Sequence, residues 1–225
     1  MSHTKIITLP QLGDVPIVIK TKRDISDETS IDKRDDESLG WGYWDRIWPS
    51  EVALSIFLIK NFFPQKLKGQ KVLEIGCGVG LAGIVAAQLG ASMTFSDMVP
   101  VTLEGVKESC HLNDITHFDT CTLDWFDIIN LNQIYTIVLG SEVFYDEKNL
   151  PGISNVLSTA LKPGGQGWFC DPNRLGVGTI EYYFQENFKF SVEEIPLDSA
   201  LRKATGGQKK IGYVYRLLKK SRQIT

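Results

Sequence analysis

The residues of this chain best suited to chemistry lie in a glycine-rich segment, Lys71 to Gly80, which reads KVLEIGCGVG. Val72 to Ile75 form a short, mostly apolar run that is typical of a buried strand. Glycines at a strand-to-helix turn adopt positive φ and allow a ligand close to the backbone. The helix that follows, over the apolar run Leu81–Leu89, presents unpaired N–H groups to that ligand. The segment therefore predicts a site for a nucleotide-type cofactor.

The spacing of the glycines bears on which cofactor this is. Gly78-Val-Gly80-Leu-Ala-Gly83 matches the dinucleotide pattern G-x-G-x-x-G. The register is awkward, because the strand runs into Gly76, where the dinucleotide fingerprint would place its first glycine. Glu74 lies two residues before Gly76, and an acid there would repel a pyrophosphate but could pair with a cationic amino acid headgroup.

The pattern from Glu74 to Gly80, E-x-G-x-G-x-G, resembles the first motif of S-adenosylmethionine-dependent methyltransferases. S-adenosylmethionine carries an α-amino group and a sulfonium but no phosphate, so an acidic rim suits it. Cys77, between two of the glycines, is expected there because it is small. Asp97 ends the next expected strand. An acid there accepts hydrogen bonds from both ribose hydroxyls, which NAD and S-adenosylmethionine both carry, so Asp97 does not tell the two cofactors apart. The alternative for Asp97 is the N-cap of a helix over 101–113.

The elements that must position these residues alternate along the chain. We expect an upstream helix over 50–62 with Ser50 as N-cap. Further helices are expected over 80–89, 100–113, 149–161 and 177–187, and strands over 71–75, 91–96, 120–123, 135–139 and 167–170. This alternation predicts an α/β fold with a mostly parallel sheet and helices on both faces. Leu161-Lys-Pro-Gly-Gly165 is expected to end a helix and turn the chain sharply.

Three further segments narrow the resemblance. They are Trp44-Asp-Arg-Ile-Trp48-Pro-Ser50, Leu123-Asp-Trp125 and Gly140-Ser-Glu-Val-Phe-Tyr145. In this order, with the glycine motif, they resemble methyltransferase family 16, the seven-stranded protein-lysine methyltransferases. The resemblance covers roughly residues 41–175 and implies the Rossmann-like seven-stranded methyltransferase fold. That fold ends in an antiparallel pair, for which the runs 188–195 and 211–218 are suited.

The resemblance also implies the roles of individual residues. Glu142 and Tyr145 would face the substrate, Glu142 binding and orienting an amine and Tyr145 walling the pocket. Asp124 and Trp125 would flank the adenine of the cofactor. The full set expected to bind S-adenosylmethionine is Trp48, Glu74, Gly76, Cys77, Gly78, Asp97, Asp124, Trp125 and Ser141. Core packing remains the alternative for Trp48 and Trp125, and a structural hydrogen bond for Glu142.

The implied function is N-methylation of a lysine side chain in a protein, with a small-molecule N-methyltransferase of the same fold as the alternative. A nucleobase amino-methyltransferase should carry N-P-P-Y where this chain has Ser141 to Tyr145, and an NAD-dependent oxidoreductase should carry a Tyr-x-x-x-Lys pair. A non-enzymatic binding module on the same fold is a further alternative. Asp171-Pro-Asn-Arg174 resembles the D-P-x-R of some branches, including enzymes acting on the electron transfer flavoprotein β subunit. In this chain, Arg174 of that segment would bind an acid of the substrate or cap the fold.

Composition sets the remaining expectations. The net charge is −3 over 225 residues, and no run reaches the roughly 18 apolar residues that span a bilayer. Four cysteines without a C-x-x-C pair, and histidines without ligand spacing, predict reduced thiols and no metal. We expect a cytoplasmic monomer that binds neither membrane nor nucleic acid. Residues 1–40 should form an N-terminal extension, a β-hairpin over 5–22 and a charged loop over 23–39, and residues 41–225 the methyltransferase domain.

Overall fold

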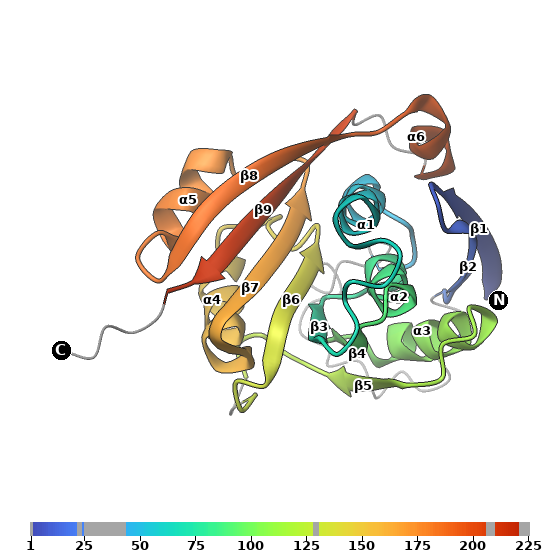
Figure 1. Cartoon of the computed structure of the whole chain (residues 1–225), viewed down its shortest axis with the longest axis horizontal. Helices are drawn as coiled ribbons and strands as arrows, with labels where there is room; N and C mark the ends of the chain where they lie inside the picture. Colours follow the sequence, from blue (N-terminus) through green and yellow to red (C-terminus); the bar gives the residue numbers. More distant parts are fainter. Residues whose placement is uncertain (1, 22–23, 25–43, 128–130, 206–209, 221–225) are drawn as a thin grey trace.

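A seven-stranded sheet forms the centre of the computed structural model, which describes residues 2–21, 24, 44–127, 131–205 and 210–220 (Figure 1). The strand order is β5-β4-β3-β6-β7-β9-β8. The strands are β3 (Lys71–Ile75), β4 (Ser92–Asp97), β5 (Phe118–Thr122), β6 (Tyr135–Ser141), β7 (Leu161–Asp171), β8 (Phe188–Pro196) and β9 (Ile211–Lys219). Neighbours from β5 to β7 pair in parallel, and β9 pairs antiparallel with both β7 and β8. The predicted mostly parallel sheet with its antiparallel end is confirmed.

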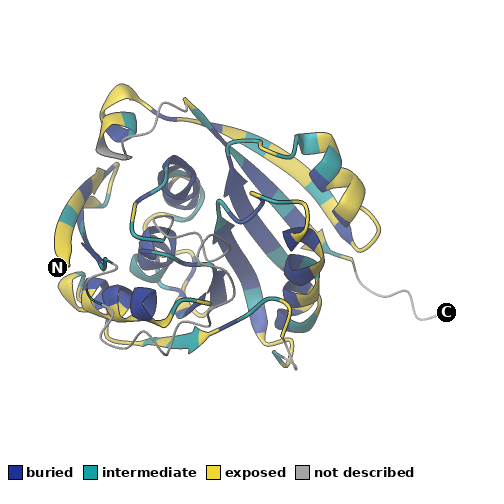
Figure 2. Ribbon diagram, turned by 180° about the vertical axis from the view of Figure 1, so that it is seen from behind, coloured by how far each residue is buried: buried dark blue, intermediate teal, exposed yellow. Residues whose placement is uncertain are grey.

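Helices cover both faces of the sheet, as predicted. One face packs against α1 (Pro49–Phe62), α2 (Leu81–Gln88) and α3 (Pro100–Leu112), whose buried side chains share one apolar core. The other face packs against α4 (Asn149–Ala160) and α5 (Val177–Phe184), which contribute to a second core. The central strands lie between these layers and are almost entirely buried (Figure 2).

Three local predictions differ from the structure. Helix α1 begins at Pro49 with Trp48 as N-cap, so Ser50 is not its cap; proline suits the first turn because no partner exists there for the missing N–H. Strand β7 begins at Leu161, which pairs with Tyr135, and the predicted Pro-Gly turn lies inside a register shift before Gln166 pairs with Ile137. A short helix, α6 (Ser199–Thr205), occupies part of the expected polar link between β8 and β9.

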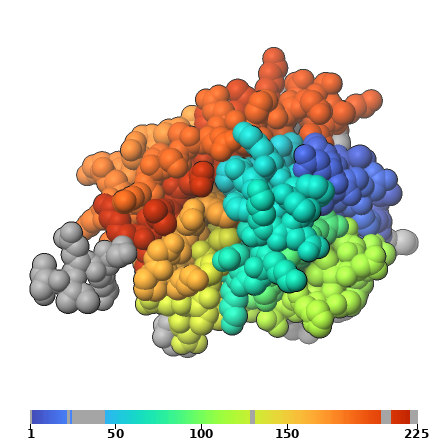
Figure 3. All heavy atoms as spheres, viewed as in Figure 1, coloured from blue at the N-terminus to red at the C-terminus, as the bar shows by residue number. Residues whose placement is uncertain are grey.

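The N-terminal hairpin is present as predicted and packs on the main domain. Strands β1 (His3–Leu9) and β2 (Gly13–Ile19) form a separate antiparallel sheet. The Val18 N–H donates to Ser109 Oγ of α3 at 2.8 Å, and Asn113 Nδ2 donates to the Pro16 carbonyl at 2.7 Å. The surface view shows the hairpin in blue beside α3 in green (Figure 3). Most of the expected charged loop over 23–39, together with Trp41, lies outside the described residues.

Close packing between α1 and β9 provides a test of this arrangement. A Cβ added at Gly212 would overlap Ala53 of α1 and lie 2.9 Å from Cys170 Sγ. Gly212→Ala is therefore expected to lower the free energy of unfolding by about 1–3 kcal/mol, the usual cost of overpacking a core. The measurement is urea denaturation.

The matched control is Gly178→Ala in α5, where an added Cβ meets nothing within 4 Å. This variant should be stabilised by up to about 1 kcal/mol, because alanine favours helix over glycine. Equal stability of the two variants would contradict the packing described here.

Candidate active site

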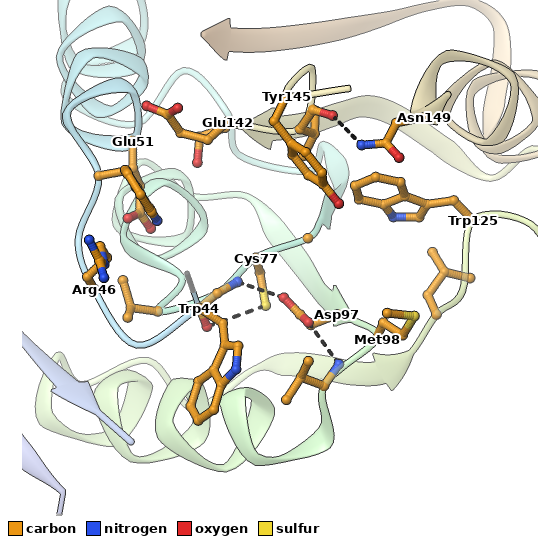
Figure 4. Close-up of a pocket in the computed structure, with 18 of the residues that line it drawn as sticks. Trp44, Arg46, Glu51, Cys77, Asp97, Met98, Trp125, Glu142, Tyr145 and Asn149 are labelled. Carbon is orange, nitrogen blue, oxygen red and sulfur yellow. Dashed lines mark hydrogen bonds between the residues drawn. The ribbon is translucent and has the colours of Figure 1, made fainter. Parts of the chain in front are cut away.

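A cavity of about 580 Å³ opens at the carboxyl ends of β3, β4 and β6. From β3 the chain continues outward to β4 and β5 on one side of the sheet, and it then returns to β6 and β7 on the other side of β3. Ligands of open α/β sheets usually bind at such a switch point. Its wall is formed by Trp44, Arg46, Trp48, Glu51, Gly76, Cys77, Gly78, Val79, Asp97, Met98, Val99, Leu123, Asp124, Trp125, Phe126, Ser141, Glu142, Val143, Tyr145, Asn149 and Arg174. All the predicted site residues except Glu74 belong to this wall (Figure 4).

The glycine turn has the left-handed backbone that the sequence predicts. Gly76, Gly78 and Gly80 have φ of 56°, 51° and 77°. A Cβ at Gly76 would lie 3.0 Å from the Trp125 ring, so only glycine leaves room for that close approach. The Cys77 N–H donates to the Ser96 carbonyl of β4 at 2.9 Å. The turn is thus held against the neighbouring strand.

Asp97 lies at the end of β4 and faces the cavity. Its Oδ2 accepts from the Gly78 N–H and its Oδ1 from the Val99 N–H, both at 2.9 Å. Helix α3 has Val99 as its N-cap, so Asp97 is not the helix cap. Burial raises the pKa of Asp97, and the Val99 and Gly78 N–H groups oppose that rise. Each carboxylate oxygen keeps a further lone pair for a ligand hydroxyl.

Glu74 does not face the cavity, in contrast to the expected acidic rim. Its side chain is buried behind the turn against Gly83 and Phe95, and neither oxygen makes a hydrogen bond of good geometry within the described residues. Burial raises the pKa of Glu74 well above its usual range, and the nearby Glu51 adds to this. Burial favours the neutral form of this carboxyl, and Glu74 is not part of the cavity wall on which a cationic headgroup would lie.

Glu51 of α1 is a cavity residue that the sequence reasoning missed. Its Oε1 accepts from the Leu81 N–H at 2.7 Å and so caps α2, whose N-cap residue is Gly80. Burial raises the pKa of Glu51 to about 8. The available signal was a single acid among small and apolar residues in the helical run from Pro49 to Leu58.

The segment before α1 closes one side of the cavity. The Arg46 guanidinium lies over the Trp48 ring, 5.0 Å from its centroid. The Trp44 carbonyl oxygen would lie 3.7 Å from a Cβ at Gly78. Figure 4 shows Arg46 and Glu51 at the same end of the cavity, with Glu142 close by. This end therefore combines acidic side chains with an arginine, as a zwitterionic ligand requires.

The opposite end is more apolar. The Trp125 indole lies against Gly76, and a Cβ on Gly152 of α4 would lie 2.9 Å from Trp125 Cβ. Asp124 Oδ1 accepts from the Phe126 N–H at 2.9 Å, which fixes the turn after Leu123. Trp125 thus packs against the second core and also forms a cavity wall, so its core packing does not remove it from the site.

Ser141, Glu142 and Tyr145 line the cavity at the end of β6. Glu142 has a left-handed backbone, φ 58°, and its N–H donates to the Cys170 carbonyl at 2.8 Å. The Glu142 carboxylate pairs with Arg174, which follows β7. The Tyr145 side chain is 58% exposed at the mouth of the cavity. No group of three metal-ligating side chains occurs among the described residues.

The raised pKa of Glu51 predicts how stability responds to pH. The carboxyl is protonated at pH 7 in the folded chain, where its pKa is about 8, but ionised in the unfolded chain, where 4.5 applies. Stability therefore falls as pH rises from about 4.5 to 8, because the folded state then binds more protons than the unfolded state. Glu51→Gln should reduce this fall, since the amide cannot titrate, and the remaining fall belongs to other buried acids such as Glu74. Urea unfolding at pH 5, 6.5 and 8 measures it.

The matched control is Glu104→Gln, which removes an exposed acid from α3. It should keep the wild-type dependence of unfolding free energy on pH. The interpretation of Glu51 is wrong if Glu51→Gln and wild type lose stability in parallel over this range.

A family model described as lysine methyltransferase matches residues 25–176. METTL21A of Danio rerio, a protein N-lysine methyltransferase, is 32% identical over 165 residues, covering 68% of this chain and 71% of the relative. METTL23 of Xenopus laevis, a histone-arginine methyltransferase, is 35% identical over 138 residues, covering 59% of this chain and 58% of the relative. The chain spans 58% of the length of the frog, human and rat METTL23 proteins.

Solved structures agree on the fold. The Thermus thermophilus 16S rRNA N2 G1207 methyltransferase RsmC superposes with a TM-score of 0.67 at 13% identity, covering 98% of this chain and 51% of that one. The N-methyltransferase NodS of Bradyrhizobium japonicum gives 0.57 at 16% identity, covering 76% and 94%. At these identities the likeness concerns the fold alone.

In the described part of the chain, no helix is long and apolar enough to cross a membrane.

Proposed function

Because the chain belongs to the lysine methyltransferase family, we propose that it transfers a methyl group from S-adenosylmethionine to the side-chain nitrogen of a lysine in a protein. The observation that carries the proposal is the position of Glu142 and Tyr145. They share one cavity with Asp97 and the glycine turn, so an acceptor and a nucleoside can be held side by side.

The residues present fit this cofactor. Asp97 keeps acceptor capacity for two ribose hydroxyls, and Trp125 offers an aromatic face for adenine. Arg46 and Glu51 lie together at one end of the cavity, where the amino acid headgroup would be held. Ser141 and Cys77 complete the wall. When bound, S-adenosylmethionine supplies an electrophilic methyl group on a cationic sulfur.

The chain's own residues must position the acceptor, because an in-line displacement depends chiefly on alignment. A lysine amine has an ordinary pKa near 10.4 and must lose its proton to react. A cavity shielded from water lowers that pKa, since burial disfavours the ammonium. Glu142 binds and orients the amine through its carboxylate, and Tyr145 restricts the amine's freedom at the mouth. The amine's proton leaves to solvent.

The mouth of the cavity supports a protein acceptor over a small molecule. Phe126 is 62% exposed, Tyr145 58% and Met98 45%, so apolar groups remain uncovered around the opening. Exposed apolar groups gathered at one place mark contact surfaces for larger partners. A small-molecule acceptor remains the second candidate, and the expected cytoplasmic location and monomeric state remain predictions.

Asp97→Ala tests the cofactor site. The variant loses the hydrogen bonds between a carboxylate and two hydroxyls, and bonds to a charged group contribute roughly 1.5–3 kcal/mol. Binding of S-adenosylhomocysteine should therefore weaken about 10- to 100-fold. Isothermal titration calorimetry with S-adenosylmethionine, S-adenosylhomocysteine and NAD measures this. Asp119→Ala, an exposed acid on β5, is the matched control and should bind as wild type does. Binding of NAD alone would overturn the proposal.

Glu142→Gln tests the acceptor site. The initial rate of tritium transfer from labelled S-adenosylmethionine to cell-lysate proteins should fall about 10²-fold, the scale expected when a reacting group is misplaced. Affinity for S-adenosylhomocysteine should change little, because the substitution keeps the size of the side chain. Glu147→Gln removes an exposed acid nearby and should keep the wild-type rate. Full activity of Glu142→Gln would exclude the assigned role.

A further inference from the structure

The Asp171-to-Arg174 segment follows β7 and has no role in the function proposed above. We propose that Arg174 is a positioning residue that holds Glu142 by one carboxylate oxygen and offsets its charge, so that a primary amine bound there can lose its proton. This inference rests on the proposed methyltransferase function and assigns a task to a residue outside the acceptor motif itself.

One nitrogen of Arg174 contacts two acids. Arg174 Nη1 pairs with Glu142 Oε2, and it lies 3.0 Å from Asp171 Oδ2. The Arg174 N–H also donates to Asp171 Oδ1 at 2.8 Å. Asp171 is 1% exposed, whereas the Arg174 side chain is 35% exposed and lines the cavity. The buried acid therefore anchors the arginine, and the arginine reaches the cavity-lining acid.

The turn that carries Arg174 is itself fixed. Asn173 has a left-handed backbone, φ 67°, and its Oδ1 accepts from the Tyr215 hydroxyl of β9 at 3.2 Å. Glu142 is held by its N–H bond to the Cys170 carbonyl on β7. Left-handed backbone costs a non-glycine residue of order 1–3 kcal/mol and persists only where surrounding contacts impose it. Both ends of the ion pair are thus held by β7 and its neighbour.

The balance of charge argues against the alternative that Arg174 binds an acid of the substrate. Arg174 is one cation shared by two carboxyl groups, so no positive charge is left over to attract a third acid. Its effect falls instead on Glu142. A carboxylate favours the ammonium form of a bound lysine, and a cation beside that carboxylate weakens this preference.

The geometry also restricts the acceptor. Glu142 Oε2 is fully buried and is the oxygen that Arg174 contacts, which leaves Oε1 as the oxygen offered to a ligand. A guanidinium is recognised best by both oxygens of a carboxylate in a fork, whereas an ammonium is a compact point charge that one oxygen can satisfy. The arrangement therefore suits lysine better than arginine as acceptor.

Other titratable groups also face Glu142. They are Arg46 before α1, Glu51 from α1, Cys170 and Asp171 on β7, Arg174 after it, and Tyr145 in the same turn as Glu142. Arg46 lies over the Trp48 ring, whereas Arg174 forms the ion pair with Glu142. Removal of Arg174 should therefore raise the pKa of the bound amine and demand a higher pH for transfer.

The test is the pH dependence of methyl transfer to cell-lysate proteins, at saturating tritiated S-adenosylmethionine, for wild type, Arg174→Met, Arg174→Gln and Arg174→Lys. The pH of half-maximal rate should rise by about one unit in the Met and Gln variants, the lower end of the shift caused by a nearby charge. Arg174→Lys keeps the charge and should restore most of the wild-type profile. Calorimetry with S-adenosylhomocysteine identifies variants that retain the fold.

The double variant Glu142→Gln with Arg174→Met isolates the coupling. Relative to Glu142→Gln alone, it should show a smaller pH shift than Arg174→Met shows relative to wild type, because the part of the effect that Arg174 exerts through Glu142 is already gone. An unshifted profile in Arg174→Met or Arg174→Gln with intact S-adenosylhomocysteine binding would overturn the inference, and so would methylarginine as the main labelled product after hydrolysis. Absence of any transfer by folded wild type would instead refute the proposed function.

Discussion

The turn between β3 and α2 is the constraint on which the site depends. Its backbone N–H groups are tied to two other elements: Cys77 and Gly78 donate to Ser96 and Asp97 at the end of β4, and Leu81 donates to Glu51 of α1. The left-handed glycines make these bonds possible, because they aim successive N–H groups in different directions. Strand β4 and helices α1 and α2 are thereby positioned relative to one short turn. The same turn forms part of the cavity wall.

Much of this architecture follows from sequence patterns with a local cause. Strand and helix periodicity, glycine in the turn and the alternating order of elements predict the sheet and where its ligand edge lies. The position of Glu74 could not be predicted, because its environment depends on which helix packs over β3 and not on its neighbours in sequence. Glu51 was missed for the same reason: its partner, Leu81, lies 30 residues away. Long-range contacts decide which acid reaches the cavity.

Acidic groups of very different exposure surround the turn. Glu74 is buried behind the turn, whereas Glu51 is buried but lines the cavity. Glu142 also lines the cavity and forms an ion pair with Arg174. Burial and the mutual repulsion of the carboxyl groups raise the pKa values of Glu51 and Glu74, so fewer negative charges stand free than the sequence alone suggests. Burial thus favours the neutral form of Glu51 and Glu74, which lowers the repulsion among the acids around the turn.

The left-handed backbone of Glu142 places stability and activity in opposition at one position. Glycine would adopt φ 58° there without strain, so selection for thermal resistance alone would favour replacing this glutamate. Consensus or directed-evolution schemes that rank variants by melting temperature would then discard the carboxylate that meets Arg174. Engineering of this chain for durability should hold residue 142 constant and seek its gains on the exposed faces of α5 and α6.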